Sequence, residues 1–232
     1  DVRDEDALGR AVTDAAAVFH LAAQVAVTSS LVDPLEDFSV NLGATVKLLE
    51  AARRRGRGAP VIFASTNKVY GDLAGLPLSI VDGAYAPAAD KRDGVDERQA
   101  LDFHSPYGCS KGAADQYALD WFRSYGLPTC VLRMSCIYGP RQMGVEDQGW
   151  VAHFVRRAMV GEPIAIFGDG RQVRDVLHVS DAVEAYLGAW ARIDDVAGRA
   201  FNLGGGPENA VSLLQVIAAI ERLIGSRIEL TF

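Results

Sequence analysis

The 232-residue chain has few cysteines and no long hydrophobic run, and each shortage excludes a class of protein. Its three cysteines, Cys109, Cys130 and Cys136, show no Cys-x-x-Cys spacing, so we expect neither a structural zinc site nor a disulfide framework. This cysteine usage fits a protein that works in a reducing cytoplasm. No apolar run reaches the ~18 residues that a membrane-spanning helix needs, so no membrane partner is expected.

Positive charge is also in short supply. The 23 basic residues, only four of them lysine, stand against 30 acidic ones, which gives a net charge of −7. This balance disfavours binding to nucleic acid or to an anionic membrane. The basic run Arg53-Arg54-Arg55-Gly56-Arg57 is better explained as a helix end, where cations are favourable and glycine stops the helix.

What the chain does contain is an alternation of short apolar runs and amphipathic stretches, which predicts parallel strand–helix–strand units in an α/β fold. The predicted strands are 18–21, 61–65, 129–134, 164–167, 173–179 and 200–203. Residues 72–103 are polar and weakly patterned, and a long excursion of this kind is often functional.

Helix starts are marked by capping residues. Asp33-Pro34 predicts a helix with one apolar face, formed by Leu35, Phe38, Leu42, Val46 and Leu49. Ser105-Pro106 predicts a helix with Ser105 as N-cap, running to Gly126. Ser212 and Gln215 predict a capping box, with Gly225 ending that helix.

Tyr107 and Lys111 are the strongest candidates for chemistry. Residues four apart lie on one helix face, so both side chains are expected to reach the same cleft. A phenol has an ordinary pKa of about 10, and a neighbouring cation favours the phenolate and lowers that pKa. The pair would then donate and accept protons at neutral pH. The alternative is an ordinary pair on a helix surface.

Thr66 is a third candidate, because it follows the predicted strand 61–65. In parallel sheets, ligands bind beyond the carboxyl ends of the strands. A hydroxyl there is placed to hydrogen-bond a substrate alcohol or its ketone. A simple turn after the strand is the alternative.

Several short motifs occur in a set order along the chain. They are His20-Leu21-Ala22-Ala23, Asn41-Leu42-Gly43-Ala44-Thr45, Ser65-Thr66, Tyr107-x-x-x-Lys111, Tyr138-Gly139-Pro140-Arg141 and Arg174-Asp175-x-x-His178-Val179-x-Asp181. The ordered set resembles the extended short-chain dehydrogenase/reductase family, the NAD-dependent nucleotide-sugar epimerases and dehydratases. The resemblance implies a Rossmann-type doubly wound parallel sheet that binds NAD over 1–139. It implies a mixed segment over 140–232, which mostly binds the nucleotide sugar and partly returns to the core.

The resemblance also implies roles for single residues. Tyr107 is the acid/base, Lys111 steadies it and binds the nicotinamide ribose, and Thr66 orients the sugar hydroxyl. The residues implied to bind NAD are Asp1, Val2, Ala22, Ala23, Gln24, Asn41, Ser65, Tyr107 and Lys111.

Two further residues are implied to bind the substrate. Arg174 matches the family residue that meets the sugar-nucleotide diphosphate. Its guanidinium is chemically suited to bind phosphate oxygens. A surface ion pair with Asp175 or Asp169 is the alternative. Asn202 could meet the nucleotide or its ribose, or belong to a turn. No metal is expected, because His104 and His178 have no partners at ligand spacing.

Part of the family pattern lies beyond this chain. The glycine-rich loop that seats the pyrophosphate of NAD at a helix N-terminus is expected before Asp1, together with the first strands of the sheet. The last segment of the family is expected after Phe232. The chain is therefore expected to belong to a longer enzyme. We also expect that enzyme to form a homo-oligomer.

A finer resemblance points to one reaction. The segments 65–72, 101–117 and 147–151 are similar to those of CDP-paratose 2-epimerases. This implies epimerisation at C2 of a CDP-linked deoxyhexose by transient oxidation and re-reduction. Asn67 and Lys68 stand where 4,6-dehydratases of the family carry an acid pair, which counts against dehydration. A 4-epimerase, a 4,6-dehydratase and a non-catalytic NAD-binding scaffold remain as alternatives.

Overall fold

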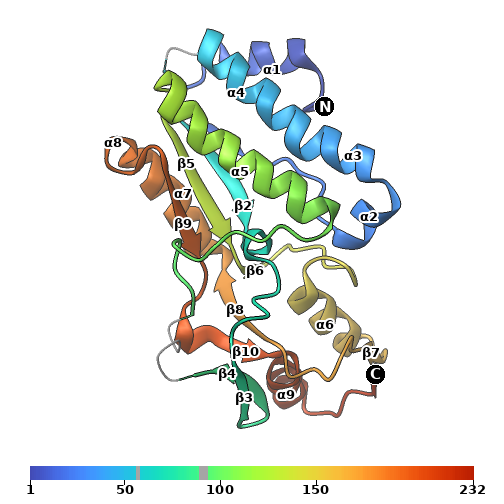
Figure 1. Ribbon diagram of the computed structural model, residues 1–232. Coiled ribbons are helices and arrows are strands. Elements are labelled where there is room, and N and C mark those ends of the chain that lie inside the picture. The colour runs from blue at the N-terminus through green and yellow to red at the C-terminus, as the bar shows by residue number, and fades with distance from the viewer. Residues whose placement is uncertain (56–57, 89–93) are drawn as a thin grey trace. The chain divides into compact units, whose positions relative to one another are not determined.

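The computed structural model describes residues 1–55, 58–88 and 94–232 (Figure 1). Contacts divide the chain into two compact units. Unit 1 comprises Asp1–Asp72, Asp96–Met134 and Val183–Leu203, and unit 2 comprises Leu73–Val95, Ser135–Ala182 and Gly204–Phe232. The sequence predicts one boundary after residue 139, with part of 140–232 returning to the core. The contacts group 183–203 with unit 1, and they also group 73–95, on the other side of that boundary, with unit 2.

Unit 1 is built on a four-stranded parallel sheet, as predicted. Its order is β1 (Val18–His20), β2 (Val61–Thr66), β5 (Thr129–Met134) and β9 (Arg199–Leu203). All three neighbouring pairs are parallel, and the β2–β5 register runs from Val61 opposite Thr129 to Thr66 opposite Met134. Strands covered on both faces read as continuous apolar runs, which is why β2 and β5 were recognisable from the sequence.

Alternate residues of the strands enter two different cores. On β2, Val61 and Phe63 pack on one face, against Leu49 of α4 (Ala44–Arg55) and Ala114 of α5 (Ser105–Tyr125). Ile62 packs on the opposite face, with Tyr186 of α7 (Val179–Ala191). Two buried faces require helices on both sides of the sheet, the arrangement of a doubly wound fold. The remaining helices of unit 1 are α1 (Glu5–Val12), α2 (Val27–Val32), α3 (Pro34–Phe38), α8 (Ile193–Val196) and the 3-10 turn η2 (Asn67–Tyr70).

The sequence predicts one continuous helix after Asp33, and this prediction is wrong for the middle of the segment. Asp33 does cap α3, since its carboxylate accepts from Glu36 N at 2.9 Å. A π-helical turn, η1 (Ser39–Gly43), then separates α3 from α4. The wider π-helical turn rotates the side chains after it relative to those before it, so the predicted residues do not share one apolar face. Leu35 is 78% exposed, whereas Leu49 is buried. The basic run after α4 is described only to Arg55, and Gly56 and Arg57 lie outside the described residues.

The start of α5 also differs by one position. His104 is the N-cap and Ser105 the first helical residue, with φ of 62°. The ring of Pro106 disfavours the right-handed helical region for the residue before it. Ser105 Oγ still accepts from Gly108 N at 3.3 Å, the bond that a cap supplies. The predicted end is confirmed, because Gly126 is left-handed at φ of 70°.

Unit 2 contains a smaller mixed sheet and two pairs of short strands. The sheet order is β10 (Ala210–Ser212), β8 (Val173–His178) and β6 (Cys136–Tyr138). The short pairs are β7 (Ile164–Ala165) with β11 (Leu230–Thr231), and the hairpin of β3 (Leu78–Val81) with β4 (Ala84–Pro87). The sequence predicted no strand in 72–103, and residues 89–93 of that range lie outside the described residues.

The helices of unit 2 pack around their own apolar cluster. Phe154 of α6 (Trp150–Met159) meets Ile217 and Ile220 of α9 (Leu213–Ile224) in this cluster. The predicted capping box is confirmed, since Ser212 N donates to Gln215 Oε1 at 2.8 Å and Gln215 N to Ser212 Oγ at 3.2 Å. A 3-10 turn, η4 (Pro207–Asn209), precedes β10. None of the helices formed by the described residues has the length and apolar character to span a bilayer.

Candidate active site

Thr66 and Tyr107 lie near each other at the carboxyl edge of the unit 1 sheet. Thr66 is the last residue of β2, and its hydroxyl accepts from Lys68 N at 3.2 Å as the cap of η2. Tyr107 lies in the first turn of α5, where its N–H donates to Ser30 Oγ at 3.2 Å. The Tyr107 side chain lies near that of Thr66, which influences its pKa, and each residue is 8% exposed. Two neighbouring hydroxyls are placed to bind one oxygen of an alcohol or ketone.

Lys111 is buried one turn further along α5. Its Nζ donates to Ala64 O at 2.6 Å and lies over the Phe63 ring, 4.4 Å from the centroid. Burial lowers the pKa of Lys111 to about 8, while the carboxylates of Asp115 and Asp37 oppose the fall. An ammonium has three N–H donors, so the group that holds Ala64 retains donors for a ligand.

The predicted lowering of the Tyr107 pKa is wrong for this structure. Burial raises the pKa of Tyr107 above its ordinary value, the hydrogen bond with Thr66 lowers it, and the charge of Asp37 raises it again. Desolvation is the largest cause, because a phenolate without water is costly. Tyr107 therefore holds its proton at neutral pH in this structure.

Asn41 is at the centre of a buried network that fixes the loop after β1. Asn41 is 1% exposed, and its Oδ1 accepts from Gln24 N at 2.9 Å. Its Nδ2 donates to Gln24 O and to Asp37 Oδ1, both at 3.0 Å. Asp37 in turn accepts from Ser110 Oγ at 2.5 Å, which ties the network to α5. Sequence reasoning singled out Asn41 but missed Asp37 and Ser110.

His20 extends this network on β1. Its Nε2 lies 2.9 Å from Thr45 Oγ1, whose own proton goes to Asn41 O at 2.5 Å. Because that hydroxyl proton is already donated, Nε2 carries the hydrogen of the ring. Burial and the charge of Lys111 lower the pKa of His20 to about 4, so it is neutral at pH 7.

The residues expected to bind NAD are not equivalent in the structure. Ala22 and Ala23 follow β1 with small side chains on the loop that Asn41 holds, where a backbone can approach a cofactor closely. The amide of Gln24 turns back to Ala26, with bonds of 2.8 and 2.5 Å. The Ser65 hydroxyl donates to Asp115 at 2.7 Å. These bonds leave the side chains of Gln24 and Ser65 engaged within the protein.

The chain start is arranged differently from the rest of this set. Asp1 pairs with Arg3 at 2.5 Å, and Arg3 also reaches Glu36 at 2.7 Å. Val2 is half-buried beside them. The donors that fit a nicotinamide dinucleotide are thus the Lys111 ammonium and the Tyr107 hydroxyl, which match ribose hydroxyls, beside the small-residue loop after β1.

The two residues expected to bind substrate lie in different units. Asn202 is on β9 of unit 1, where its Oδ1 accepts from Tyr70 OH at 2.6 Å and its N–H donates to Glu97 at 2.6 Å. Arg174 is on β8 of unit 2 and donates to Val173 O at 2.7 Å. The suggested acidic partners of Arg174 have other contacts: Asp175 accepts from Ser135, and Asp169 accepts from Tyr85 at 2.8 Å. Their roles in binding substrate stay predictions.

The histidines and cysteines singled out from the sequence have local partners. His104 Nε2 lies 3.0 Å from Asp102, and His178 Nδ1 lies 2.7 Å from Ser180 Oγ. Cys130 is buried, and burial raises its pKa to about 11. Cys109 is exposed and Cys136 is half-buried.

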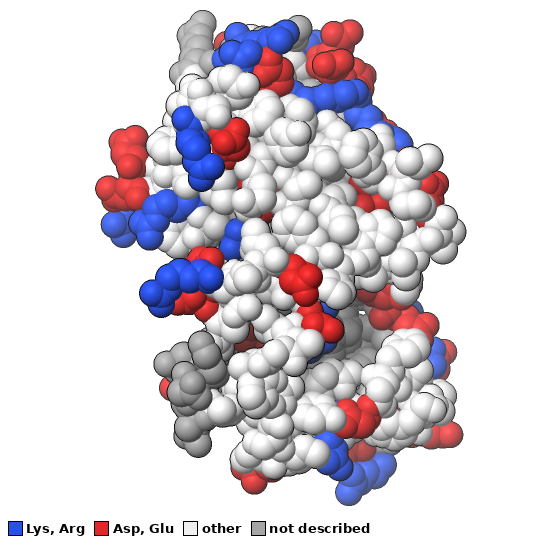
Figure 2. All heavy atoms as spheres, viewed as in Figure 1, with Lys and Arg blue, Asp and Glu red and all other residues white. Residues whose placement is uncertain are grey.

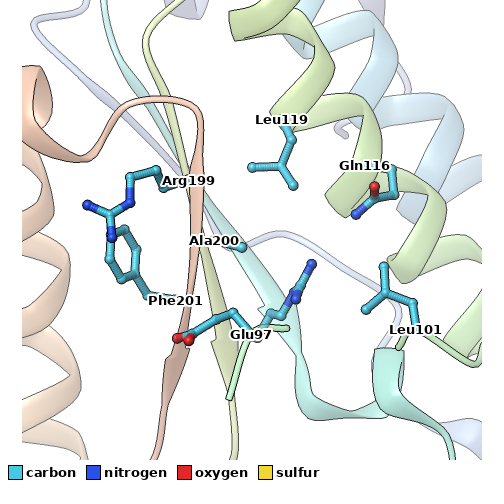
Figure 3. Close-up of a pocket in the computed structure, with 8 residues that line it drawn as sticks. Glu97, Leu101, Gln116, Leu119, Arg199, Ala200 and Phe201 are labelled. Carbon is cyan, nitrogen blue, oxygen red and sulfur yellow. The ribbon is translucent and has the colours of Figure 1, made fainter. Parts of the chain in front are cut away.

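Sequence reasoning also missed a buried ion pair between Asp115 and Arg133. The carboxylate and guanidinium meet through two bonds of 2.9 Å. Arg133 lines an open cavity of about 480 Å³. Figure 3 shows Arg199 over the ring of Phe201 at this cavity, 4.7 Å from the centroid. The available signal was spacing, since Asp115 follows Lys111 by four residues on an otherwise buried helix face.

Comparison with known proteins places these features in context. Residues 1–204 match the model of the NAD dependent epimerase/dehydratase family. The chain is 45% identical over 228 residues to CDP-paratose 2-epimerase of Salmonella typhi, covering 95% of this chain and 67% of that protein. It is 33% identical over 214 residues to dTDP-glucose 4,6-dehydratase of Neisseria meningitidis serogroup B, covering 88% and 54%.

Solved structures agree with this assignment. UDP-glucose 4-epimerase of Thermotoga maritima with UDP-glucose superposes with a TM-score of 0.83 at 30% identity, covering 100% of this chain and 69% of that one. UDP-glucose 4-epimerase of Thermus thermophilus in complex with NAD gives 0.82 at 31% identity, covering 100% and 70%. The chain spans about two thirds of the length of the 2-epimerase and about half of the dehydratase.

Proposed function

Because the chain belongs to the NAD-dependent epimerase/dehydratase family, we propose that it inverts C2 of a CDP-linked deoxyhexose such as CDP-paratose. The observation that carries the proposal is that Thr66 at the end of β2 and Tyr107 in the first turn of α5 lie near each other, with the buried Lys111 one turn further along α5. The 45% identity to a CDP-paratose 2-epimerase supports the choice of sugar and carbon. Arg174 is proposed to meet the diphosphate and Asn202 the nucleotide side of the substrate.

The chemistry divides between a cofactor and three side chains. NAD, when bound, supplies the acceptor and the later donor of the hydride that leaves and re-enters the sugar carbon. Lys111 and the loop of Ala22 and Ala23 would hold it. Tyr107 takes the proton from the sugar hydroxyl in the first half of the reaction and returns it to the ketone oxygen in the second.

The charge of Lys111 and the hydroxyl of Thr66 assist this proton transfer. A phenolate must form before Tyr107 can accept a proton, and a charged ammonium on the same helix face favours it. The ordinary phenol form, which burial favours here, is the one that returns the proton. Thr66 is placed to hold the same substrate oxygen during both steps.

Asn67 and Lys68 support epimerisation over dehydration. A 4,6-dehydratase must protonate a departing hydroxyl and remove a carbon-bound proton, which requires acid and base groups beside the Thr. Asn67 lies next to Thr66, with its Oδ1 3.5 Å from Thr66 Oγ1, and an amide does not titrate. A 4-epimerase is the second candidate, favoured by the structural likeness to UDP-glucose 4-epimerases.

The test is to incubate the full-length protein and NAD separately with CDP-paratose, CDP-glucose and UDP-glucose. Epimerisation leaves the mass unchanged and alters the proton couplings at the inverted carbon, whereas dehydration removes one water. We expect inversion at C2 of CDP-paratose, and Tyr107→Phe as the matched inactive control. Inversion of UDP-glucose with CDP-paratose unchanged would replace the proposal by a 4-epimerase. NAD binding with no turnover of any sugar would support a scaffold.

We also propose that the protein forms a homo-oligomer through an uncharged face of unit 1. Figure 2 shows a broad area without charged side chains over the helices α3 and α5. The exposed apolar side chains of these two helices include Leu35 at 78%, Phe38 at 54% and Tyr125 at 56%. Apolar patches of this kind commonly mark protein interfaces. Sedimentation of the protein and of a Leu35→Glu variant tests this proposal, and an unchanged monomer in both cases contradicts it.

A further inference from the structure

The ion pair of Asp115 and Arg133 lies behind the residues assigned to catalysis. Asp115 is fully buried on α5, and Arg133 is 5% exposed on β5. The Asp115 carboxylate accepts from Nε and Nη2 of Arg133, at 2.9 Å each. It also accepts from Ser65 Oγ at 2.7 Å and from Gln116 Nε2 at 2.9 Å. A charge-assisted pair with two parallel bonds fixes the orientation of both side chains.

The pair reaches the strand end that carries Thr66 by two routes. Ser65, which donates to Asp115, is the residue directly before Thr66 on β2. Arg133 Nη1 donates to Tyr70 OH at 2.9 Å, and the guanidinium lies 5.3 Å from the centroid of the Tyr70 ring. Tyr70 ends η2, the turn that Thr66 caps. One buried junction therefore joins α5, β2, β5 and η2.

The same carboxylate acts on Lys111 through its charge. Lys111 is 3% exposed, and burial lowers its pKa, while the charges of Asp115 and Asp37 raise it. Asp37 faces it from α3, and Asp115 lies one turn along its own helix.

The other titratable groups around Lys111 add little negative charge at neutral pH. His20 on β1 is neutral at pH 7, since its pKa is about 4. Tyr107 on α5 keeps its proton, because burial raises its pKa. Arg133 on β5 is paired with Asp115 itself. The charge that supports the ammonium thus comes from two carboxylates.

We propose that Asp115 is a positioning residue for the reaction, a role that rests on the proposed function. With Arg133 it holds the end of β2 with Thr66 against the helix of Tyr107 and Lys111, and its charge keeps the Lys111 ammonium protonated. Replacing both partners of a buried ion pair is often tolerated, whereas removing one partner leaves an uncompensated buried charge. Replacing both partners therefore separates the two roles.

The experiment compares two variants with the wild-type protein. Asp115→Asn removes the charge but leaves Arg133 buried and unpaired, which can prevent folding. The double variant Asp115→Asn with Arg133→Gln keeps a neutral hydrogen-bonded pair, and the open cavity beside Arg133 admits water around the shorter side chain. Asp120→Asn is the control, because it removes an exposed carboxylate of α5 that lies 3.7 Å from Arg123.

Two readouts are measured from about pH 6 to about pH 10: kcat and KM on CDP-paratose, and equilibrium unfolding without NAD or substrate. In the double variant we expect kcat at pH 8 to fall about tenfold, KM to change less than about threefold, and the alkaline fall of kcat to move about one pH unit lower. The pH range over which the Lys111 proton changes the free energy of unfolding should move lower together with the alkaline fall of kcat. Asp120→Asn keeps the wild-type profile.

A double variant that folds and superimposes on the wild type in both pH profiles overturns the proposal. Failure of the proposed function gives a different result. In that case the wild-type protein itself inverts none of the sugar nucleotides. The unfolding profiles need neither NAD nor substrate, so they still report the effect of Asp115 on Lys111 in that case.

Discussion

Replacing Lys111 by methionine is expected to change how the stability of the protein depends on pH. The Lys111 ammonium is buried, and burial lowers its pKa from the ordinary lysine value of 10.5, which applies to the unfolded chain, to about 8 in the folded protein. Between these two values the unfolded chain holds a proton that the folded chain has released. The free energy of unfolding of the wild-type protein therefore rises with pH through this window.

The magnitude follows from the two pKa values. The difference between 10.5 and about 8 corresponds to about 3 kcal/mol, at about 1.4 kcal/mol per pH unit. Lys111→Met has no proton to release, so the wild type should gain about 3 kcal/mol relative to the variant between about pH 7 and about pH 11. Loss of the bond to Ala64 O shifts the variant by a constant amount and leaves this difference unchanged.

The assay is urea unfolding followed by tryptophan fluorescence, which reports unit 1 through Trp121 and Trp190. Lys47→Met serves as the matched control, because Lys47 lies on α4 with its ammonium 3.3 Å from Arg3 O at the surface. A constant gap between wild type and Lys111→Met across this pH range would refute the reasoning. It would show that the fold does not disfavour the charged form of Lys111.

Three further predictions concern turnover, the cofactor and the substrate. Tyr107→Phe removes only the phenolic oxygen, so kcat should fall about 10² to 10⁴-fold while the melting temperature stays close to that of the wild type; activity within threefold would exclude Tyr107 as the acid/base. Asn41→Ala frees the loop at Gln24 and removes the amide donor of Asp37 Oδ1, so unfolding should cost about 1 to 3 kcal/mol less and NAD should bind more weakly in calorimetry. Arg174→Ala should raise KM for the sugar nucleotide by about tenfold or more with NAD affinity unchanged, and an unchanged KM would remove Arg174 from the diphosphate site.

Features that depend on near neighbours in the chain were predictable. The capping box joins Ser212 and Gln215, which are three positions apart. The end of α5 depends on one left-handed glycine, Gly126. The apolar runs of β2 and β5 are recognisable because both of their faces are buried. Thr66 at a strand end and Tyr107 with Lys111 on one helix face follow from the same local geometry.

Features that depend on distant partners were not predictable. Asp115 meets Ser65 across 50 positions and Arg133 across 18, and Asp37 meets Ser110 across 73. No periodicity in the sequence encodes such pairs. The π-helical turn η1 was not predictable for the same reason. It places Asn41 inside a network whose other members come from α3, the loop after β1 and α5.

The sequence by itself determined the parallel α/β fold, the family and the identity of the candidate catalytic residues, because these depend on local patterns and on the order of motifs. Only the tertiary structure decided the electrostatic state of the site. Whether Tyr107 releases its proton depends on how much water it loses and on which charges surround it. Burial raises its pKa and lowers that of Lys111. Desolvation is a property of the folded surroundings, which residue spacing along the chain cannot convey.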